Sequence, residues 1–206
     1  MQGIKHIIFD LGGVILNIDY KRTEQAFTAL GVKDFSSLYS QFNATPLFED
    51  LETGRVENDA FVTAMLPYLP EGTTPEAITG AWNAMLLDFP LARLQLLQQL
   101  RQHYSLYLLS NTNAIHLAAF NAILEKSRGI PSLDEFFDKS YYSHQIGYRK
   151  PEKEAYQVIL DENNLQPAET LFIDDTLPNV EAARELGIRA IHLQAPRTIL
   201  DVFRPV

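Results

Sequence analysis

The chain has 206 residues and a mass of 23.4 kDa, a length that fits one domain, or one core with a modest second lobe, and excludes two large domains. Hydrophobic residues make up 46% of the chain and charged residues 21%, which excludes extended disorder. The net charge of −9 leaves no basic stripe for a phosphate backbone, so we expect no nucleic acid partner.

Buried strands and helices alternate along most of the chain. The first apolar run, Ile4–Phe9, is rich in β-branched residues and stops at Asp10, and the next glycines, Gly12 and Gly13, force a tight loop. Later runs of the same kind predict further strands at Leu106–Leu109, Lys139–Tyr142, Thr170–Ile173 and Ala190–Leu193. Helical patterns lie between them, at Leu91–His103, Ala114–Glu125, Glu152–Asn163 and Asn179–Leu186. This alternation predicts an α/β fold with a Rossmann-like, doubly wound parallel sheet that helices cover on both faces.

The strand pattern disappears between Asp19 and Leu87. Apolar segments broken by glycine and proline predict helices there, at Lys21–Leu30, Phe35–Ala44, Glu57–Leu66 and Pro75–Met85. We expect this insert after the first strand to be a small helical cap, residues 17–90, over a core domain of residues 1–16 and 91–206. Asp19 and Tyr20 would then flank the hinge into the cap. Large aromatic residues are expected in the packed faces of the cap helices: Phe42, Phe48, Phe61 and Trp82.

The sequence contains no cysteine, which excludes disulfides, thiol catalysis and thiolate metal sites. No stretch approaches the roughly 18 apolar residues of a membrane span, and the first residues do not match a secretory signal. We therefore expect a cytoplasmic protein with no membrane partner. The pattern does not indicate the oligomeric state.

Polar residues follow several of the predicted strands. Asp10 comes after the first, Ser110 and Asn111 after the second, and the pair Asp174 and Asp175 after a later one. Because ligands bind beyond the carboxyl ends of parallel strands, we expect these side chains to meet. Adjacent carboxylates near a third one repel each other unless they are protonated or a cation bridges them, and Mg²⁺ is the hard cation that oxygen ligands favour.

A lysine and a polar turn complete this group. Lys150 precedes Pro151 at the head of a predicted helix, where the helix dipole disfavours a cation unless an anion is held nearby. The turn Ser110–Thr112 offers a hydroxyl, an amide and backbone N–H groups that suit phosphate oxygens. A carboxylate nucleophile, a bound cation, a hydroxyl and a lysine together indicate phosphoryl transfer through an aspartyl phosphate.

Four segments, in this order, resemble the signatures of the haloacid dehalogenase-like (HAD) hydrolases. They are Phe9–Val14, Leu109–Thr112, Arg149–Pro151 and Phe172–Asp175. The resemblance covers nearly the whole chain, and four ordered matches are far more specific than any one of them. The opening, the cap and the ending Asp174–Gly187 look most like the branch that contains bacterial α-glucose-1-phosphate phosphatase and the N-terminal phosphatase domain of mammalian epoxide hydrolase.

The resemblance implies a role for each site residue. Asp10 would be the nucleophile and a Mg²⁺ ligand, and the backbone carbonyl of Gly12 and the Asp175 carboxylate would complete the protein ligands. Asp174 would act on the metal through water. Lys150 would neutralise the nucleophile and the phosphate, while Ser110 and Asn111 would hold the transferring phosphoryl oxygens. The implied function is a Mg²⁺-dependent phosphatase of small phosphorylated metabolites, with sugar phosphates such as glucose 1-phosphate as candidates.

One departure from the family pattern concerns Gly12. Phosphatases of this family usually carry an aspartate two residues after the nucleophile, which protonates the leaving alcohol and then activates water. A water molecule, another residue or a good leaving group must take over here, and His144 is the histidine to test as a stand-in acid. A sugar 1-phosphate, with its less basic leaving group, would lose least.

Two other kinds of function stay open at this point. Relatives that cleave carbon–halogen or phosphonate bonds also lack an aspartate at the Gly12 position, although such dehalogenases need no metal. A low-activity protein that only binds phosphorylated ligands is the other alternative. Arg55, in a turn of the predicted cap, is either a substrate contact or a solvated surface residue.

Overall fold

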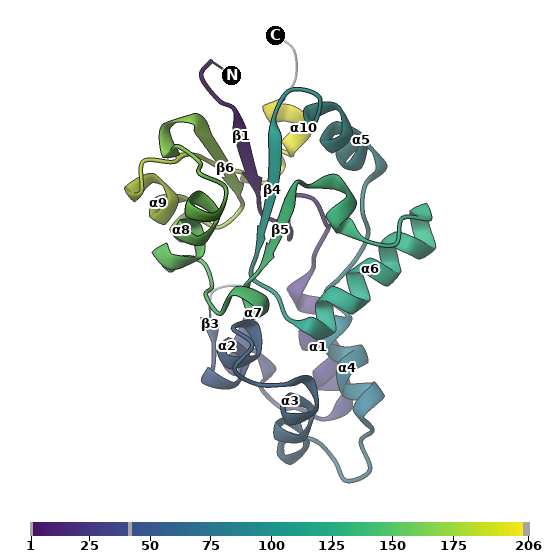
Figure 1. Ribbon diagram of the computed structural model, residues 1–206. Helices are drawn as coiled ribbons and strands as arrows, with labels where there is room; N and C mark the ends of the chain where they lie inside the picture. Colours follow the sequence, from purple (N-terminus) through teal and green to yellow (C-terminus); the bar gives the residue numbers. More distant parts are fainter. Residues whose placement is uncertain (1, 41–42, 204–206) are drawn as a thin grey trace.

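A parallel five-stranded sheet forms the centre of the larger part of the molecule (Figure 1). The computed structural model describes residues 2–40 and 43–203. The strands lie in the order β5-β4-β1-β6-β7, and their bounds are β1 His6–Phe9, β4 Ser105–Ser110, β5 Lys139–Tyr142, β6 Thr170–Asp174 and β7 Arg189–His192. The central strand β1 pairs with β4 on one side and β6 on the other, so Phe9 lies between Leu108 and Ile173. The predicted fold class is confirmed.

Helices cover both faces of this sheet, because successive strand residues point in opposite directions. Ile7 and Phe9 pack toward one face, against α5 (Leu91–Leu100), α6 (Ala114–Arg128) and α10 (Ile199–Val202). Ile8 packs toward the other, against α8 (Lys153–Glu162) and α9 (Leu177–Glu185). Short turns of helix connect these elements: η3 Leu133–Phe136, α7 Ser143–Ile146 and η4 Pro167–Glu169.

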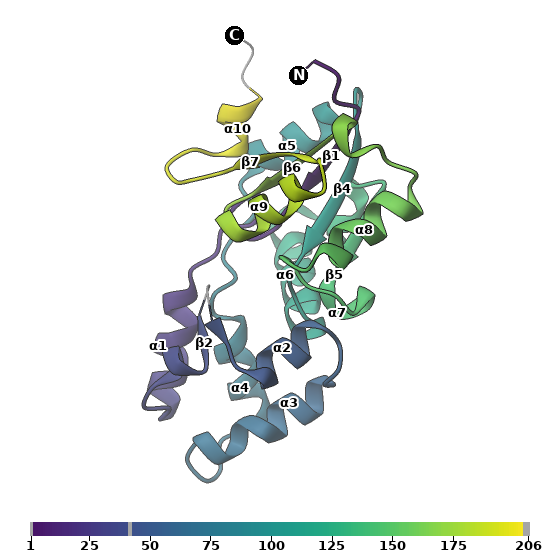
Figure 2. The ribbon, with the colours of Figure 1, turned by 90° about the vertical axis from the view of Figure 1, so that its left-hand side faces the viewer.

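A second group of helices lies beyond the carboxyl ends of the strands (Figure 2). It comprises α1 (Tyr20–Leu30), α2 (Pro46–Glu52), α3 (Asn58–Met65) and α4 (Pro75–Asn83), with the short turns η1 (Phe35–Ser37) and η2 (Leu66–Tyr68) and the hairpin β2 (Tyr39–Ser40) and β3 (Asn43–Ala44). These elements have a core of their own, built around Phe27, Phe35, Phe48, Phe61 and Trp82. Of the aromatic residues expected there, Phe42 lies outside the described residues.

The helix predicted for Phe35–Ala44 is wrong over its described part. The Asp34 side chain accepts a hydrogen bond from the Ser37 backbone and closes a single 3₁₀ turn, after which Tyr39 pairs with Ala44 in the hairpin. Phe35 still reaches the apolar core, where its ring stacks on Phe27 at 4.3 Å. The apolar spacing correctly indicated a buried residue, Phe35, but the segment forms a turn and a hairpin rather than a continuous helix.

Helix α2 (Pro46–Glu52) was not predicted. It begins at Pro46, whose ring suits the first turn of a helix because no backbone N–H is needed there. This helix carries Glu49 and Glu52, both of which line the cavity described below.

Two neighbouring segments of chain connect the helical group to the sheet. Asn17 exchanges backbone hydrogen bonds with Leu87 and Asp88, each at 3.0 Å, and Ile18 forms an antiparallel bridge with Leu86. Both connections therefore run side by side. Across the described residues, no helix is long and apolar enough to cross a membrane.

Candidate active site

Three strand ends meet at one cavity. Asp10 follows β1, Ser110 ends β4, and the pair Asp174 and Asp175 ends and follows β6. The cavity has a volume of about 400 Å³ and lies between these strand ends and the helical group. Strand β1 is the point at which the chain changes direction across the sheet, and such a point is where α/β sheets bind ligands. The volume suits a small molecule.

The three aspartates form a group that fits a divalent cation. One carboxylate oxygen from each of Asp10, Asp174 and Asp175 lies within 4.8 Å of the others. Asp10 and Asp174 are buried, and burial of several carboxylates together is costly without positive charge among them. An all-oxygen donor set of this kind suits Mg²⁺, which prefers a few carboxylates and keeps some water ligands.

The pKa values of these carboxyl groups show the same need for a cation. Burial, together with the charges of Asp174 and Asp175, raises the pKa of Asp10 to about 8 against the opposing effect of Lys150. Burial also raises the pKa of Asp175, again with a contribution from Asp174. A bound cation lowers such pKa values, and Asp10 must be ionised to act as a nucleophile.

Lys150 supplies part of that positive charge. Its side chain is buried, and its Nζ donates hydrogen bonds to Asp10 Oδ1 at 2.6 Å and Asp174 Oδ2 at 2.7 Å. The two carboxylates more than compensate for the effect of burial, so the pKa of Lys150 is raised and the group stays charged.

Asp174 and Asp175 have different surroundings. Asp174 is fully buried, and its carboxylate also accepts hydrogen bonds from the Thr176 backbone at 2.7 Å and from Asn179 Nδ2 at 3.1 Å. Asp175 lines the cavity, next to Gly12. Asp174 thus lies behind the other two carboxylates and holds Lys150 in place, whereas Asp175 lies at the cavity wall.

Gly13 allows Asp175 to approach the first loop. Its φ of +73° is unfavourable for other residues, and a Cβ at this position would collide with Asp175 Oδ2. The tight turn predicted after β1 is therefore also a requirement for the position of the carboxylate.

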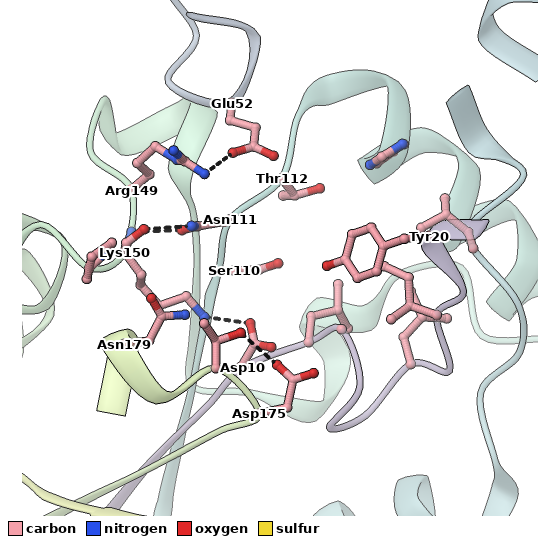
Figure 3. A pocket seen from close by; sticks show the side chains of 18 of the residues that line it. Asp10, Tyr20, Glu52, Ser110, Asn111, Thr112, Arg149, Lys150, Asp175 and Asn179 are labelled. Atoms are coloured by element: carbon pink, nitrogen blue, oxygen red, sulfur yellow. Dashed lines mark hydrogen bonds and ion pairs between the residues drawn. The ribbon is translucent and has the colours of Figure 1, made fainter. Parts of the chain in front are cut away.

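Ser110 and Asn111 lie on the wall beside Asp10, as expected (Figure 3). The Asn111 side chain binds the Lys150 backbone on both sides, with its Nδ2 donating to the Lys150 carbonyl and its Oδ1 accepting from the Lys150 N–H, both at 2.8 Å. The amide thereby holds the lysine in place. The Nδ2 group of Asn111 carries a second N–H besides the one that it gives to Lys150, and the Ser110 hydroxyl points into the cavity.

The opposite wall comes from the helical group. Glu52 is buried, accepts a hydrogen bond from the Tyr39 hydroxyl at 3.1 Å and forms an ion pair with Arg149 at 2.9 Å. Arg149 also pairs with Glu49 at 3.2 Å. Because Arg149 directly precedes Lys150, these contacts join the helical group to the loop that carries the lysine.

Sequence reasoning did not find these wall residues. Arg149 appeared only as part of a motif, and Glu52 lies in a short acidic stretch outside every predicted element. Their neighbours in space are a hundred residues away in the chain, so local spacing carried no signal. Tyr20, expected only at the hinge, also lines the cavity.

Two residues singled out from the sequence lie elsewhere. His144 does not line the cavity, so the structure does not support it as a stand-in acid. Arg55 is exposed and pairs with Asp50 at 2.6 Å on the surface of the helical group, away from the cavity lining.

The comparison with protein families agrees with this geometry. Residues 4–187 match the model of the haloacid dehalogenase-like hydrolases. The chain belongs to this family. The predicted family and the assignment as a hydrolase are therefore confirmed, while the branch within the family stays a prediction.

Curated relatives include several phosphatases. The chain is 35% identical to D-ribitol-5-phosphate phosphatase of Bacteroides thetaiotaomicron over 184 residues, which cover 89% of each chain. It is 29% identical to a sesquiterpene phosphatase of Aspergillus oryzae over 196 residues, 92% of this chain and 89% of that one.

Solved structures extend the comparison to a metal. A HAD family enzyme of Bacteroides thetaiotaomicron, crystallised with magnesium and inorganic phosphate, superposes with a TM-score of 0.85 at 31% identity and covers 98% of this chain and 100% of its own. With the group of three aspartates found here, this confirms the expected Mg²⁺ cofactor for a chain of this kind. An L-2-haloacid dehalogenase matches with a TM-score of 0.61 at 19% identity, which shows the shared fold alone.

Proposed function

We propose that this HAD-like hydrolase is a Mg²⁺-dependent phosphatase that hydrolyses monophosphate esters of small metabolites, with polyol and sugar phosphates as the first candidates. The observation that carries the proposal is the group of three carboxylates around Lys150 at the floor of a small cavity. The relatives named above, one a ribitol phosphate phosphatase, support it. We treat residues 17–90 as the cap and the rest as the core domain.

Each residue of the site has a role in this proposal. Asp10 attacks phosphorus and forms an aspartyl phosphate, while Lys150 offsets the charge on Asp10 and on the phosphoryl group. Ser110 and Asn111 hold phosphoryl oxygens. Asp10, Asp175 and the Gly12 carbonyl would hold Mg²⁺, with Asp174 acting from behind, and the ion would supply positive charge beside the phosphoryl group. Water then hydrolyses the aspartyl phosphate and restores Asp10.

The acidic site favours this chemistry over the alternatives. A dehalogenase of this fold needs no metal, and the charge of three neighbouring carboxylates, two of them buried, would then lack a cation to neutralise it. A protein that only binds phosphorylated ligands would share the site but release no phosphate. The cavity of about 400 Å³ leaves room for an organic group beyond the phosphate.

The test is phosphate release from a panel of ribitol 5-phosphate, glucose 1-phosphate and a terpenyl phosphate, with Mg²⁺ and with EDTA. We expect release that needs Mg²⁺ and that falls by at least about 10³-fold in Asp10→Asn. The control variant is Asp161→Asn, on the exposed side of α8, which should keep the wild-type rate. Halide release from 2-chloropropionate without phosphate release, or no turnover at all, would contradict the proposal.

A further inference from the structure

Gly12 stands where the family usually carries its proton-donating aspartate, and the structure shows which side chain borders the space that the aspartate would fill. A Cβ at Gly12 would lie in ordinary contact with the Ile18 side chain, at 3.5 Å. Ile18 is thus the neighbour of any side chain at this position, and it lies two residues before Tyr20. The wall beside the absent carboxylate continues directly into Tyr20, and both Ile18 and Tyr20 line the cavity.

The hydroxyl of Tyr20 points into this space. Figure 3 shows it directed from the wall of the helical group toward Ser110, above the carboxylates of Asp10 and Asp175. No hydrogen bond joins this hydroxyl to any part of the chain that the structure describes; the ring only contacts that of Tyr39, with the centroids 6.3 Å apart. A phenol directed into a polar cavity without a partner is free to bind a ligand atom.

Two other protic groups that line the cavity are already engaged. The Tyr39 hydroxyl donates to Glu52, and His116 Nε2 lies 3.1 Å from the Trp82 carbonyl. Glu52 itself is held by Arg149 on the far side of the cavity from Asp10 (Figure 3).

The position of Tyr20 agrees with the geometry of phosphoryl transfer. The attacking and leaving oxygens lie roughly in line on opposite sides of phosphorus. Since Asp10 attacks from the sheet, the leaving oxygen lies toward the helical group, where α1 begins with Tyr20. We propose that the Tyr20 hydroxyl is the proton donor to the leaving oxygen, in place of the carboxylate absent at Gly12. The inference rests on the proposed phosphatase function.

The proton follows a closed path. As Asp10 bonds to phosphorus, the electron pair of the broken P–O bond stays on the leaving oxygen, which takes the Tyr20 proton and departs as the alcohol. The oxygen of a water molecule then bonds to phosphorus and the water gives one proton to the Tyr20 oxygen. The bond between Asp10 and phosphorus breaks, and its electron pair returns to the Asp10 carboxylate. The products are the alcohol and inorganic phosphate, and the protein is regenerated.

Tyr20 is protonated when the reaction begins. Burial raises the pKa of its hydroxyl above the usual value, and the charges of Asp175 and Asp10 raise it further. The phenol is therefore protonated at neutral pH and can donate its proton.

The experiment compares two leaving groups in Tyr20→Phe. An alkyl phosphate such as ribitol 5-phosphate needs a proton donor, whereas p-nitrophenyl phosphate releases a stable phenolate. We expect kcat for the alkyl ester to fall by about 10²-fold or more, and kcat for the aryl ester to fall by less than about threefold. Tyr39→Phe is the matched control, since it removes another hydroxyl from the same cavity and should affect both esters alike.

The outcomes separate this inference from the proposed function. Equal losses for the two esters in Tyr20→Phe, or a selective loss in Thr112→Val instead, would overturn the role of Tyr20 while the phosphatase function stands. A wild-type protein that releases no phosphate from either ester overturns both. Binding of inorganic phosphate in the presence of Mg²⁺, unchanged in Tyr20→Phe, shows that the variant retains the site.

Discussion

Lys150 is the residue on which the charge balance of the site depends. Its ammonium group lies between Asp10 and Asp174, and only 1% of its side chain is exposed. Buried ion pairs contribute little net stability compared with apolar packing, but removal of one partner leaves the other charge buried and unpaired. The loss of Lys150 therefore affects both the fold and the reaction.

We predict that Lys150→Met lowers the free energy of unfolding at pH 7 in EDTA by roughly 3 kcal/mol, as measured by urea denaturation. Lys139→Met is the control, because Lys139 pairs with Glu162 at the surface, with about half of its side chain exposed, and should change stability by less than about 1 kcal/mol. Mg²⁺ should restore part of the lost stability in Lys150→Met, since it supplies charge to the same carboxylates. Equal effects of the two substitutions would contradict this account.

At the scale of the element, the strands were predictable because each one is an apolar run that ends at a polar residue. The ends of β1, β4 and β6 then brought Asp10, Ser110 and Asp174 together, since parallel strands share their carboxyl edge. The fold class and the floor of the site followed from the sequence for this reason.

The helical group was less predictable, because its elements are short and depend on one another. Asp34 ends a predicted helix after one turn, and Pro46 begins an unpredicted one. The position of Glu52 on α2, and its pairing with Arg149, depend on how α2 packs against the core. No local pattern encodes such a contact.

Helices α4 and α6 meet through one aromatic pair. His116 on α6 stacks on Trp82 of α4 with the ring centroids 4.5 Å apart. Burial lowers the pKa of His116 to about 4, against a small opposing effect of its hydrogen bond to the Trp82 carbonyl. The contact between the helical group and the core therefore contains a neutral imidazole.

This pair predicts a loss of stability in acid. Between pH 6.5 and about 4 the unfolded chain binds a proton at His116 and the folded chain does not, so the stabilisation is complete above pH 6.5 and decreases as the pH falls. We expect this residue to account for roughly 2 kcal/mol of the difference between pH 7 and pH 4.5. His116→Phe keeps a ring against Trp82 and should remove that part of the pH dependence.

Urea denaturation followed by the fluorescence of Trp82, the single tryptophan, provides the measurement. His103→Gln is the control, since this residue is exposed in the turn after α5. The same pH dependence in His116→Phe and in wild type would show that His116 does not titrate as described.

At the scale of the whole molecule, an acidic protein encloses a site for an anionic group. The net charge of −9 opposes binding of phosphate, so the proposed function requires local positive charge, which Lys150 and a cation at the carboxylates would supply. The helical group covers this site (Figure 2) and is joined to the core by paired segments at Asn17 and Leu87. Its position over the strand ends is then secured by contacts across the cavity.

Arg149 provides the ionic part of those contacts. It comes from the core and pairs with Glu49 and Glu52 of α2. We predict that Arg149→Met raises KM for phosphorylated substrates about tenfold, with a smaller effect on kcat, because the wall formed by α2 is no longer held against the Lys150 loop. Arg55→Met removes an arginine whose partner, Asp50, lies in the same helical group, and should leave KM within about twofold.

A double-mutant cycle tests whether the effect passes through Glu52. The Glu52 carboxylate is buried, and burial raises its pKa against the opposing effect of Arg149. Arg149→Met removes that opposing charge and therefore favours the protonated form of Glu52. We expect Arg149→Met and Glu52→Gln each to destabilise the protein, and the double variant to lose less than the sum, by a coupling free energy of about 1–3 kcal/mol. Additive losses in urea denaturation would mean that the ion pair does not hold the helical group to the core, and that the paired segments alone position it.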